Sequence, residues 1–136
     1  MFEQFEALAG EWVGMTNEDR QLKVSYKLSV NGTVLVETWE LRPGLDALTL
    51  YHMDGDDLIA THYCPLGNQP RLRLESSSDG IYYFEFVSAT NMASMGEEHN
   101  QSFEFQIRGA NEFLRSETYV KAGGAELQSG VYPRVS

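Results

Sequence analysis

Strict alternation of apolar and polar residues is the feature that most constrains what this chain can fold into. It is clearest from residue 22 to residue 30, where every second residue is apolar, as in a strand with one buried face. Asn31-Gly32 follows directly, and Asn-Gly is a strong signal for a two-residue type I′ turn because both residues tolerate positive φ. A two-residue turn fixes the register of a hairpin. It predicts that Tyr26 pairs with Glu37.

Alternating segments of similar length continue toward the C-terminal end. They are residues 33–41, 48–53, 58–64, 71–75, 81–88, 103–107, 113–121 and 127–132. Before them, residues 1–9 place apolar side chains on one side of a short helix, which Gly10 is expected to end. We therefore expect an all-β fold, a closed antiparallel up-and-down barrel of about 8–10 strands after a short N-terminal helix. A β-sandwich is the alternative, and residues 1–136 are expected to form a single domain.

Charge and composition exclude several classes of partner. The formal net charge is −10 and no run of Lys or Arg occurs, whereas nucleic acids and anionic membranes attract proteins through basic clusters. We therefore expect neither a nucleic acid nor a membrane partner, and the acidity serves solubility or, alternatively, a basic partner protein. The single cysteine rules out an internal disulfide, and we find no signal-peptide pattern and no apolar run of ~20 residues. A cytoplasmic protein is expected, and a homodimer is left open.

Polar residues on the inner face are the first candidates for a site. The hairpin register places Glu37 on the apolar face, opposite Tyr26, where a carboxylate needs a hydrogen bond, a cation or a ligand. A three-residue turn over residues 54–56 would bring His52 to that face, in a row with the other two. A four-residue turn would instead put His52 and His62 on opposite faces. Such a cluster either orients a ligand or is a self-satisfied network that fixes the register.

His62 and Cys64 are predicted to share the inner face, nearer one end of the barrel. Together with His52 or His99 they could hold a metal ion, but the spacing is not one of the strong zinc patterns. Cys64 as a nucleophile with His62 as its base is a weaker alternative, because alternate residues on a strand point in parallel and no oxyanion hole is evident. We therefore expect no metal and no cofactor.

Two loops contribute further candidate ligand contacts. Residues 64–70 hold Asn68 and Gln69 between turn formers, so their amides could border the mouth of a pocket. Asn91 and His99 flank an irregular segment that could form a mobile rim, and such rims are where ligands enter. The two methionines of that segment are either adaptable apolar contacts or filler.

Gly10-Glu11-Trp12, after a short helix and at the start of the first strand, resembles the G-x-W opening of the calycins, the lipocalin and fatty-acid-binding superfamily. The runs LAGEW, LVET, YHMDGD, THYCPLGNQPR and ATN resemble a group of uncharacterised bacterial lipocalin-like proteins, the DUF1579-type domains. The resemblance extends from Leu8 to Tyr119. It implies a barrel with an internal cavity, and a tryptophan that closes one end and packs on a basic residue near the C-terminus, here Arg134. The group has no agreed activity to carry over.

The resemblance also implies a set of recurring polar positions. As they fall in this chain, they are Glu37, His52, His62, Cys64, Asn68, Gln69, Arg71, Asn91 and His99. The opening from Gly10 to Gly14 is similar to that of the haem-binding nitrobindin barrels as well, which would imply haem. Their C-terminal haem-ligating histidine has no match here, because the last histidine of this chain is His99.

Three functions compete on this evidence. The leading hypothesis is a binder of a small hydrophobic or amphipathic molecule, since barrels of this size enclose one such ligand between apolar walls, here residues 39, 84, 86, 103 and 105. The expected ligand contacts are Tyr26, Glu37, Trp39, His52, His62, Cys64, Asn68, Gln69, Asn91 and His99. An ionised Glu37 disfavours a fatty acid and favours a neutral or cationic head group. The enzyme alternative makes Glu37, with an elevated pKa, a general base and His52 or His62 its acid partner. Haem or metal binding is the third.

Overall fold

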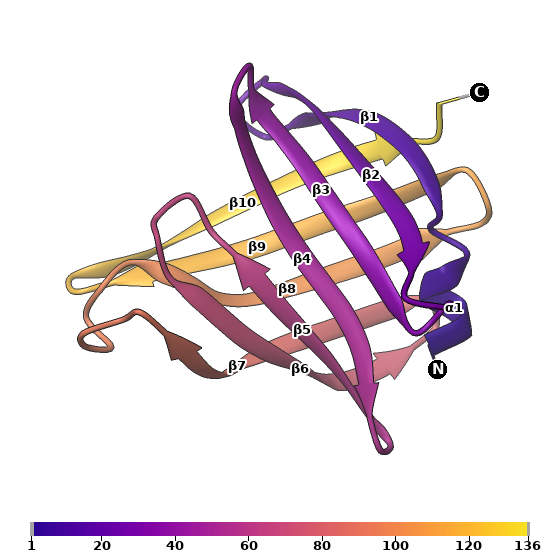
Figure 1. Ribbon diagram of the computed structural model, residues 1–136. Helices are drawn as coiled ribbons and strands as arrows, with labels where there is room; N and C mark the ends of the chain where they lie inside the picture. Colours follow the sequence, from indigo (N-terminus) through magenta and orange to yellow (C-terminus); the bar gives the residue numbers. More distant parts are fainter. Residues whose placement is uncertain (1, 136) are drawn as a thin grey trace.

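The fold is a closed antiparallel barrel that follows one short helix (Figure 1). A computed structural model describes residues 2–135. The elements are α1 (Phe2–Glu6), β1 (Gly10–Thr16), β2 (Gln21–Ser29), β3 (Val34–Arg42), β4 (Leu45–Asp54), β5 (Asp57–Tyr63), β6 (Gln69–Ser78), β7 (Ile81–Thr90), β8 (His99–Arg108), β9 (Glu112–Lys121) and β10 (Gly124–Pro133). Each strand pairs with its sequence neighbours, and β1 pairs with β10 to close the barrel. The predicted up-and-down barrel is confirmed.

The register of the β2–β3 hairpin is as predicted. Tyr26 pairs with Glu37 and Val24 pairs with Trp39. Asn31 and Gly32 both have positive φ, of 57° and 77°, as a type I′ turn requires. Because side chains alternate across a strand, this register turns Glu37 into the lumen, where it is completely buried.

The β4–β5 hairpin differs from the prediction in one residue of its turn. Asp54 pairs with Asp57, so the loop has two residues and not three, with Gly55 at positive φ. A change of one residue in loop length reverses the faces of one strand relative to its partner, and here β4 is the strand that differs from the prediction, because His62 on β5 faces inward as expected. Tyr51 and His62 therefore face the lumen, whereas His52 pairs with Ile59 on the outward-facing set. The predicted row that included His52 is wrong.

The N-terminal helix is shorter than expected and lies across one end of the barrel (Figure 1). It ends at Glu6, and Gly10 begins β1 at a φ of 130° instead of capping the helix. The space beside Gly10 is restricted, because a Cβ there would come within 2.7 Å of Nη1 of Arg134. With α1 the sole helix among residues 2–135, that part of the chain holds no helix long and apolar enough to cross a membrane.

The half of the lumen next to α1 is filled with aromatic side chains. Phe5 of the helix is fully buried and contacts four rings. These are Tyr51 at 5.8 Å, Tyr82 at 5.0 Å, Phe84 at 5.7 Å and Phe105 at 5.3 Å between ring centroids. Three of the four are edge-on, which is a favourable geometry for aromatic pairs. This end of the barrel is therefore a solid core, and two residues expected to be ligand walls, Phe84 and Phe105, belong to it.

The expected contact between Trp12 and Arg134 is present at the same end. The guanidinium carbon lies 4.2 Å from the centroid of the Trp12 ring, a cation–π distance. Arg134 also donates hydrogen bonds to the carbonyls of Ala7, Ala9 and Ala110. It thus ties the C-terminal end of the chain to the linker between α1 and β1. The tie matters because β1 and β10 pair over a short stretch, with Met15 opposite Val131 and Thr16 opposite Gly130.

Substitution of Gly14 tests how tightly β1 packs against β10, where the barrel closes. A Cβ on Gly14 would overlap the carbonyl oxygen of Val131 and lie 2.7 Å from the Tyr132 ring. We expect Gly14→Ala to lower the free energy of unfolding by about 1–3 kcal/mol or more, because backbone must move. Gly124→Ala is the matched control, since a Cβ there meets nothing within 4 Å. Urea unfolding measures both, and equal stabilities for the two variants would contradict the packing described.

Candidate ligand-binding site

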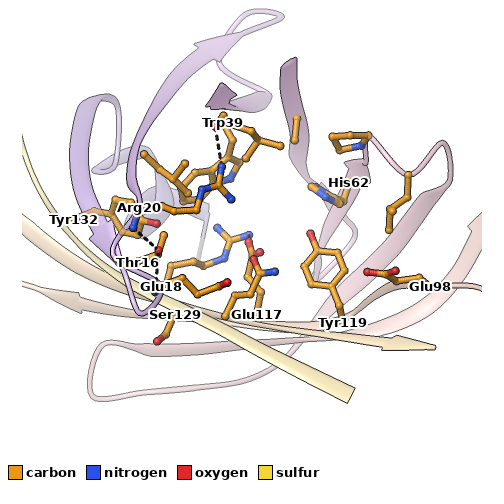
Figure 2. A pocket seen from close by; sticks show the side chains of 17 residues that line it. Thr16, Glu18, Arg20, Trp39, His62, Glu98, Glu117, Tyr119, Ser129 and Tyr132 are labelled. Atoms are coloured by element: carbon orange, nitrogen blue, oxygen red, sulfur yellow. Dashed lines mark hydrogen bonds and ion pairs between the residues drawn. The ribbon is translucent and has the colours of Figure 1, made fainter. Parts of the chain in front are cut away.

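The half of the lumen away from α1 contains a cavity of about 220 Å³ (Figure 2). Its inner walls are apolar, aromatic and polar side chains in about equal measure. They include Leu22, Trp39, Ala47, His62, Arg115, Glu117, Tyr119 and Tyr132. The mouth includes Glu18, Arg20, Pro65, Leu66 and Glu98 from the loops between strands. The barrel is therefore closed at the helix end and open at the other.

A buried ion pair separates the cavity from the aromatic core. Nη1 of Arg115, on β9, lies 2.8 Å from Oε2 of Glu37, on β3. The same carboxylate oxygen accepts hydrogen bonds from the hydroxyls of Tyr26 at 2.8 Å and Tyr51 at 2.7 Å. Both charged side chains are at most 2% exposed. Buried charges of this kind persist only when they are paired and hydrogen-bonded. Both conditions are met at Oε2 of Glu37 and Nη1 of Arg115, whereas Oε1 of Glu37 has no hydrogen-bond partner among the described residues.

The guanidinium of Arg115 has contacts on several sides. Its central carbon lies 4.1 Å from the Phe103 centroid and 4.6 Å from the Phe105 centroid. Nη2 lies 3.1 Å from Oε1 of Glu117. With the Trp39 ring centroid at 5.4 Å as well, Arg115 is held between two carboxylates and three aromatic rings. It lines the cavity, but its charge is already balanced from within the protein.

The two carboxylates have opposite pKa shifts. Burial works against the ionised form of Glu37, but Arg115 and the hydrogen-bond donors around it outweigh burial and hold its pKa below the usual value. Burial raises the pKa of Glu117, against the opposing effect of Arg115 and with help from the charge of Glu37. Glu37 therefore lacks the elevated pKa that the enzyme hypothesis requires of a general base.

His62 lies on the wall of the cavity and is 3% exposed. Its Nδ1 is 2.9 Å from the hydroxyl of Thr49, the residue that pairs with Glu37 across β3 and β4. Its Nε2 is buried and has no hydrogen-bond partner among the residues that the structure describes. Burial lowers the pKa of His62 to about 4. The imidazole is therefore neutral near pH 7, with one nitrogen free for a ligand.

Trp39 offers a second polar atom without a partner. Its side chain lines the cavity, and Nε1 is buried with no acceptor among residues 2–135. The other tryptophan is different, because Nε1 of Trp12 donates to the carbonyl of Leu8 at 2.9 Å. The two indole N–H groups thus report on opposite ends of the barrel.

The candidate residues predicted from the sequence divide into two groups. Trp39 and His62 line the cavity, and Tyr26 and Glu37 form the layer beneath it. The remaining six, all expected to contact a ligand, do not line the cavity. They are His52, Cys64, Asn68, Gln69, Asn91 and His99.

The two histidines outside the cavity have local partners. Nδ1 of His52 lies 3.1 Å from the carbonyl oxygen of Met53, on the outward-facing side of β4. His99 is fully buried, and its two ring nitrogens meet the carbonyl of Glu97 and the side chain of Gln101. Both sets of contacts are structural, and neither histidine reaches the cavity that His62 lines.

Of the other four residues, Asn68, Gln69 and Asn91 bind backbone carbonyls of the rim instead of lining the cavity. Asn68 donates to the carbonyl of Glu98 at 2.9 Å. Gln69 and Asn91 both donate to the carbonyl of Gly67, at 3.1 Å and 2.6 Å. Cys64 is half-buried, and burial raises the pKa of its thiol. A raised pKa means less thiolate near neutral pH, so the nucleophile hypothesis gains no support.

Sequence reasoning missed the residues of β9 that complete the site. Phe113, Arg115, Glu117 and Tyr119 occupy alternate positions of this strand, and the first is a fully buried core residue. Since alternate residues share a face, Phe113 would have placed the other three in the lumen. The alternation was present in the sequence, but the inward positions after Phe113 hold polar or amphipathic residues, so the strand lacks the usual apolar pattern.

Metal and haem fit this site poorly. Among residues 2–135 no three His, Cys, Asp or Glu side chains are grouped so as to hold a metal ion. His62 is the one histidine of that part of the chain that lines the cavity. The volume of about 220 Å³ is below the ~300 Å³ at which pockets for drug-sized ligands begin, and haem is larger than such ligands. The residues present do not fit haem.

Arg115→Met tests whether the ion pair organises the lumen. The substitution strands the fully buried Glu37 carboxylate without a cation, and we expect it to lower the free energy of unfolding by about 3–5 kcal/mol. The double variant Glu37→Leu/Arg115→Met removes both charges, and we expect it to be clearly more stable than the single variant. Urea unfolding of the three proteins measures this. A double variant less stable than Arg115→Met would contradict the claim that the unpaired Glu37 carboxylate causes the loss of stability.

The pH dependence of stability tests the buried state of His62. Its pKa is about 4 in the folded protein and about 6.5 in an unfolded chain. The unfolded state therefore binds the proton first as pH falls, and the stabilisation from this group is complete above pH ~6.5 and lost between there and about 4. Over this range we expect the free energy of unfolding to fall by about 3 kcal/mol. His62→Gln should remove this pH dependence, and His52→Gln, on the outer face, should retain it. Parallel profiles for wild type and His62→Gln would refute the assignment.

Comparison with known proteins places the fold but not the ligand. No protein-family model and no curated protein matches the chain. Among solved structures, the crystal structure of Rv2717c from M. tuberculosis is similar, with a TM-score of 0.70 over 99% of this chain and 97% of that one. The two sequences are 16% identical, so the similarity is one of fold alone. The chain has the lipocalin-like fold, a ten-stranded antiparallel barrel with a short helix before the first strand.

Proposed function

We propose that this protein binds a small, partly apolar molecule in the open half of its barrel. The observation that carries the proposal is two neutral buried groups on the cavity wall, Nε2 of His62 and Nε1 of Trp39, which, like Nε and Nη2 of Arg115, have no hydrogen-bond partner within the described chain. Leaving a buried polar group unsatisfied costs about 1–3 kcal/mol. A ligand that meets both atoms would recover that free energy, and the aromatic side chains around them would supply apolar contact.

The size of the cavity limits the ligand. In another protein, a dry cavity of ~150 Å³ holds one benzene molecule. The cavity here is about 220 Å³ and continues into an open mouth, so it suits one ring with a short substituent. A longer molecule would extend through the mouth between Arg20 and Leu66. The aromatic core around Phe5 leaves the ligand no route toward α1.

The two tryptophans provide a direct test. In a ¹H–¹⁵N spectrum their indole N–H signals report separately on the cavity and on the closed end, and Trp39→Phe assigns them. We expect addition of one-ring compounds such as benzyl alcohol or phenylacetamide to shift the Trp39 signal and to leave the Trp12 signal unchanged. Ala47→Leu, which adds a bulky side chain to the cavity wall, should weaken that response, whereas Ala125→Leu on exposed β10 should not. A panel of such compounds that leaves Trp39 unshifted would refute the proposal.

A further inference from the structure

We infer that the ligand of this cavity is a small organic cation, a one-ring molecule whose ammonium group lies beside Glu117. The inference rests on the proposed function, because it names the ligand class of the same site. It is argued from the charges that line the cavity, from what Arg115 is already bound to, and from the aromatic composition of the walls.

Arg115 is a poor anchor for an anionic ligand, because two carboxylates already share its charge, although its Nε and Nη2 have no hydrogen-bond partner among the described residues. In a lipid- or acid-binding barrel, a buried arginine would be the obvious partner of a carboxylate head group. Here one edge of the guanidinium is occupied by Glu37 at 2.8 Å and another by Glu117 at 3.1 Å. An incoming carboxylate would have to displace Glu117 and would then lie near the permanent charge of Glu37. Like charges this close disfavour each other strongly in a buried site.

The charge balance of the cavity favours a cation. Four carboxylates, Glu18, Glu37, Glu98 and Glu117, lie on or just below its surface, against two guanidinium groups, Arg20 and Arg115. Arg20 is at the mouth, where Nη2 donates to the carbonyl of Leu41 at 2.9 Å. The neutral His62 adds no positive charge. With all carboxylates ionised, the site carries a formal excess of two negative charges.

Glu117 is the acidic group best placed to receive a ligand. It meets Arg115 through Oε1, and 17% of its side chain is exposed on the cavity wall. Figure 2 shows Glu117 between the rim residue Glu18 and the ring of Tyr119, which points toward His62. Burial, with a smaller contribution from the charge of Glu37, raises the pKa of Glu117, and an ammonium group beside it would stabilise the ionised carboxylate.

The walls suit a cation with an aromatic or apolar body. Trp39, Tyr119 and Tyr132 line the cavity, and aromatic faces attract cations through their quadrupoles. The Trp39 and Tyr132 rings are packed edge-on at 5.3 Å, so they form one continuous apolar wall. A small aromatic ammonium ion therefore finds a carboxylate on one side and ring faces on the other.

Three compounds of matched skeleton and different charge test the inference. They are 2-phenylethylammonium, phenylacetamide and phenylacetate, titrated at pH 7 into the full-length protein by calorimetry and by the Trp39 indole signal. We expect the ammonium to bind at least about tenfold more tightly than the amide, as one charge-assisted contact provides, and the carboxylate to bind more weakly than both. Glu117→Gln should remove the preference for the ammonium and leave binding of the amide nearly unchanged.

Glu126→Gln is the matched control, because it removes the same charge from an exposed position of β10 outside the cavity. It should keep the preference. If the amide or the carboxylate binds as tightly as the ammonium, or if the preference survives Glu117→Gln, the inference about charge fails while the proposed binding function stands. If none of the three compounds shifts the Trp39 signal, the inference fails, and the wider panel then decides whether binding itself fails with it.

Discussion

The ion pair between Glu37 and Arg115 is the interaction on which the arrangement of the lumen depends. It joins β3 to β9 across the barrel interior, far apart in sequence. Two tyrosine hydroxyls donate to the same carboxylate oxygen as Arg115, which helps the buried charges to persist. On one side of this layer lie the aromatic rings around Phe5, and on the other lies the cavity.

The layer also determines the charge that the cavity presents to a ligand bound as proposed. A hydrophobic replacement of the pair could be equally stable, since burying charges is itself costly. With the pair in place, Arg115 presents a cation that is already neutralised, and Glu117 presents a carboxylate that is only partly compensated. The residues that stabilise the interior therefore set the sign of the potential at the site. In the proposed function, stability and selectivity would depend on the same few side chains.

Much of this fold could be predicted from local sequence rules. Each part that could not be predicted has an identifiable physical cause. Asn31-Gly32 defines a turn with one dominant geometry, so the inward position of Glu37 followed correctly. The turn at Gly55 admits two or more loop lengths with similar composition, and a one-residue error placed His52 on the wrong face. The partner of Glu37 was not predictable by pairing rules at all, because Arg115 reaches it through the lumen and not along the sheet.

The helix α1 covers one end of the barrel, and the cavity opens at the other end. A ligand bound as proposed would enter and leave through this mouth, so the loops around it would govern both rates of exchange. It also means that the depth available to a ligand is fixed by the Glu37–Arg115 layer and by Phe5 behind it. In a series of ligands with the same head and longer tails, each added carbon beyond the mouth would extend into solvent. Affinity would then reach a plateau at a short tail, which distinguishes this barrel from one that encloses a whole fatty chain.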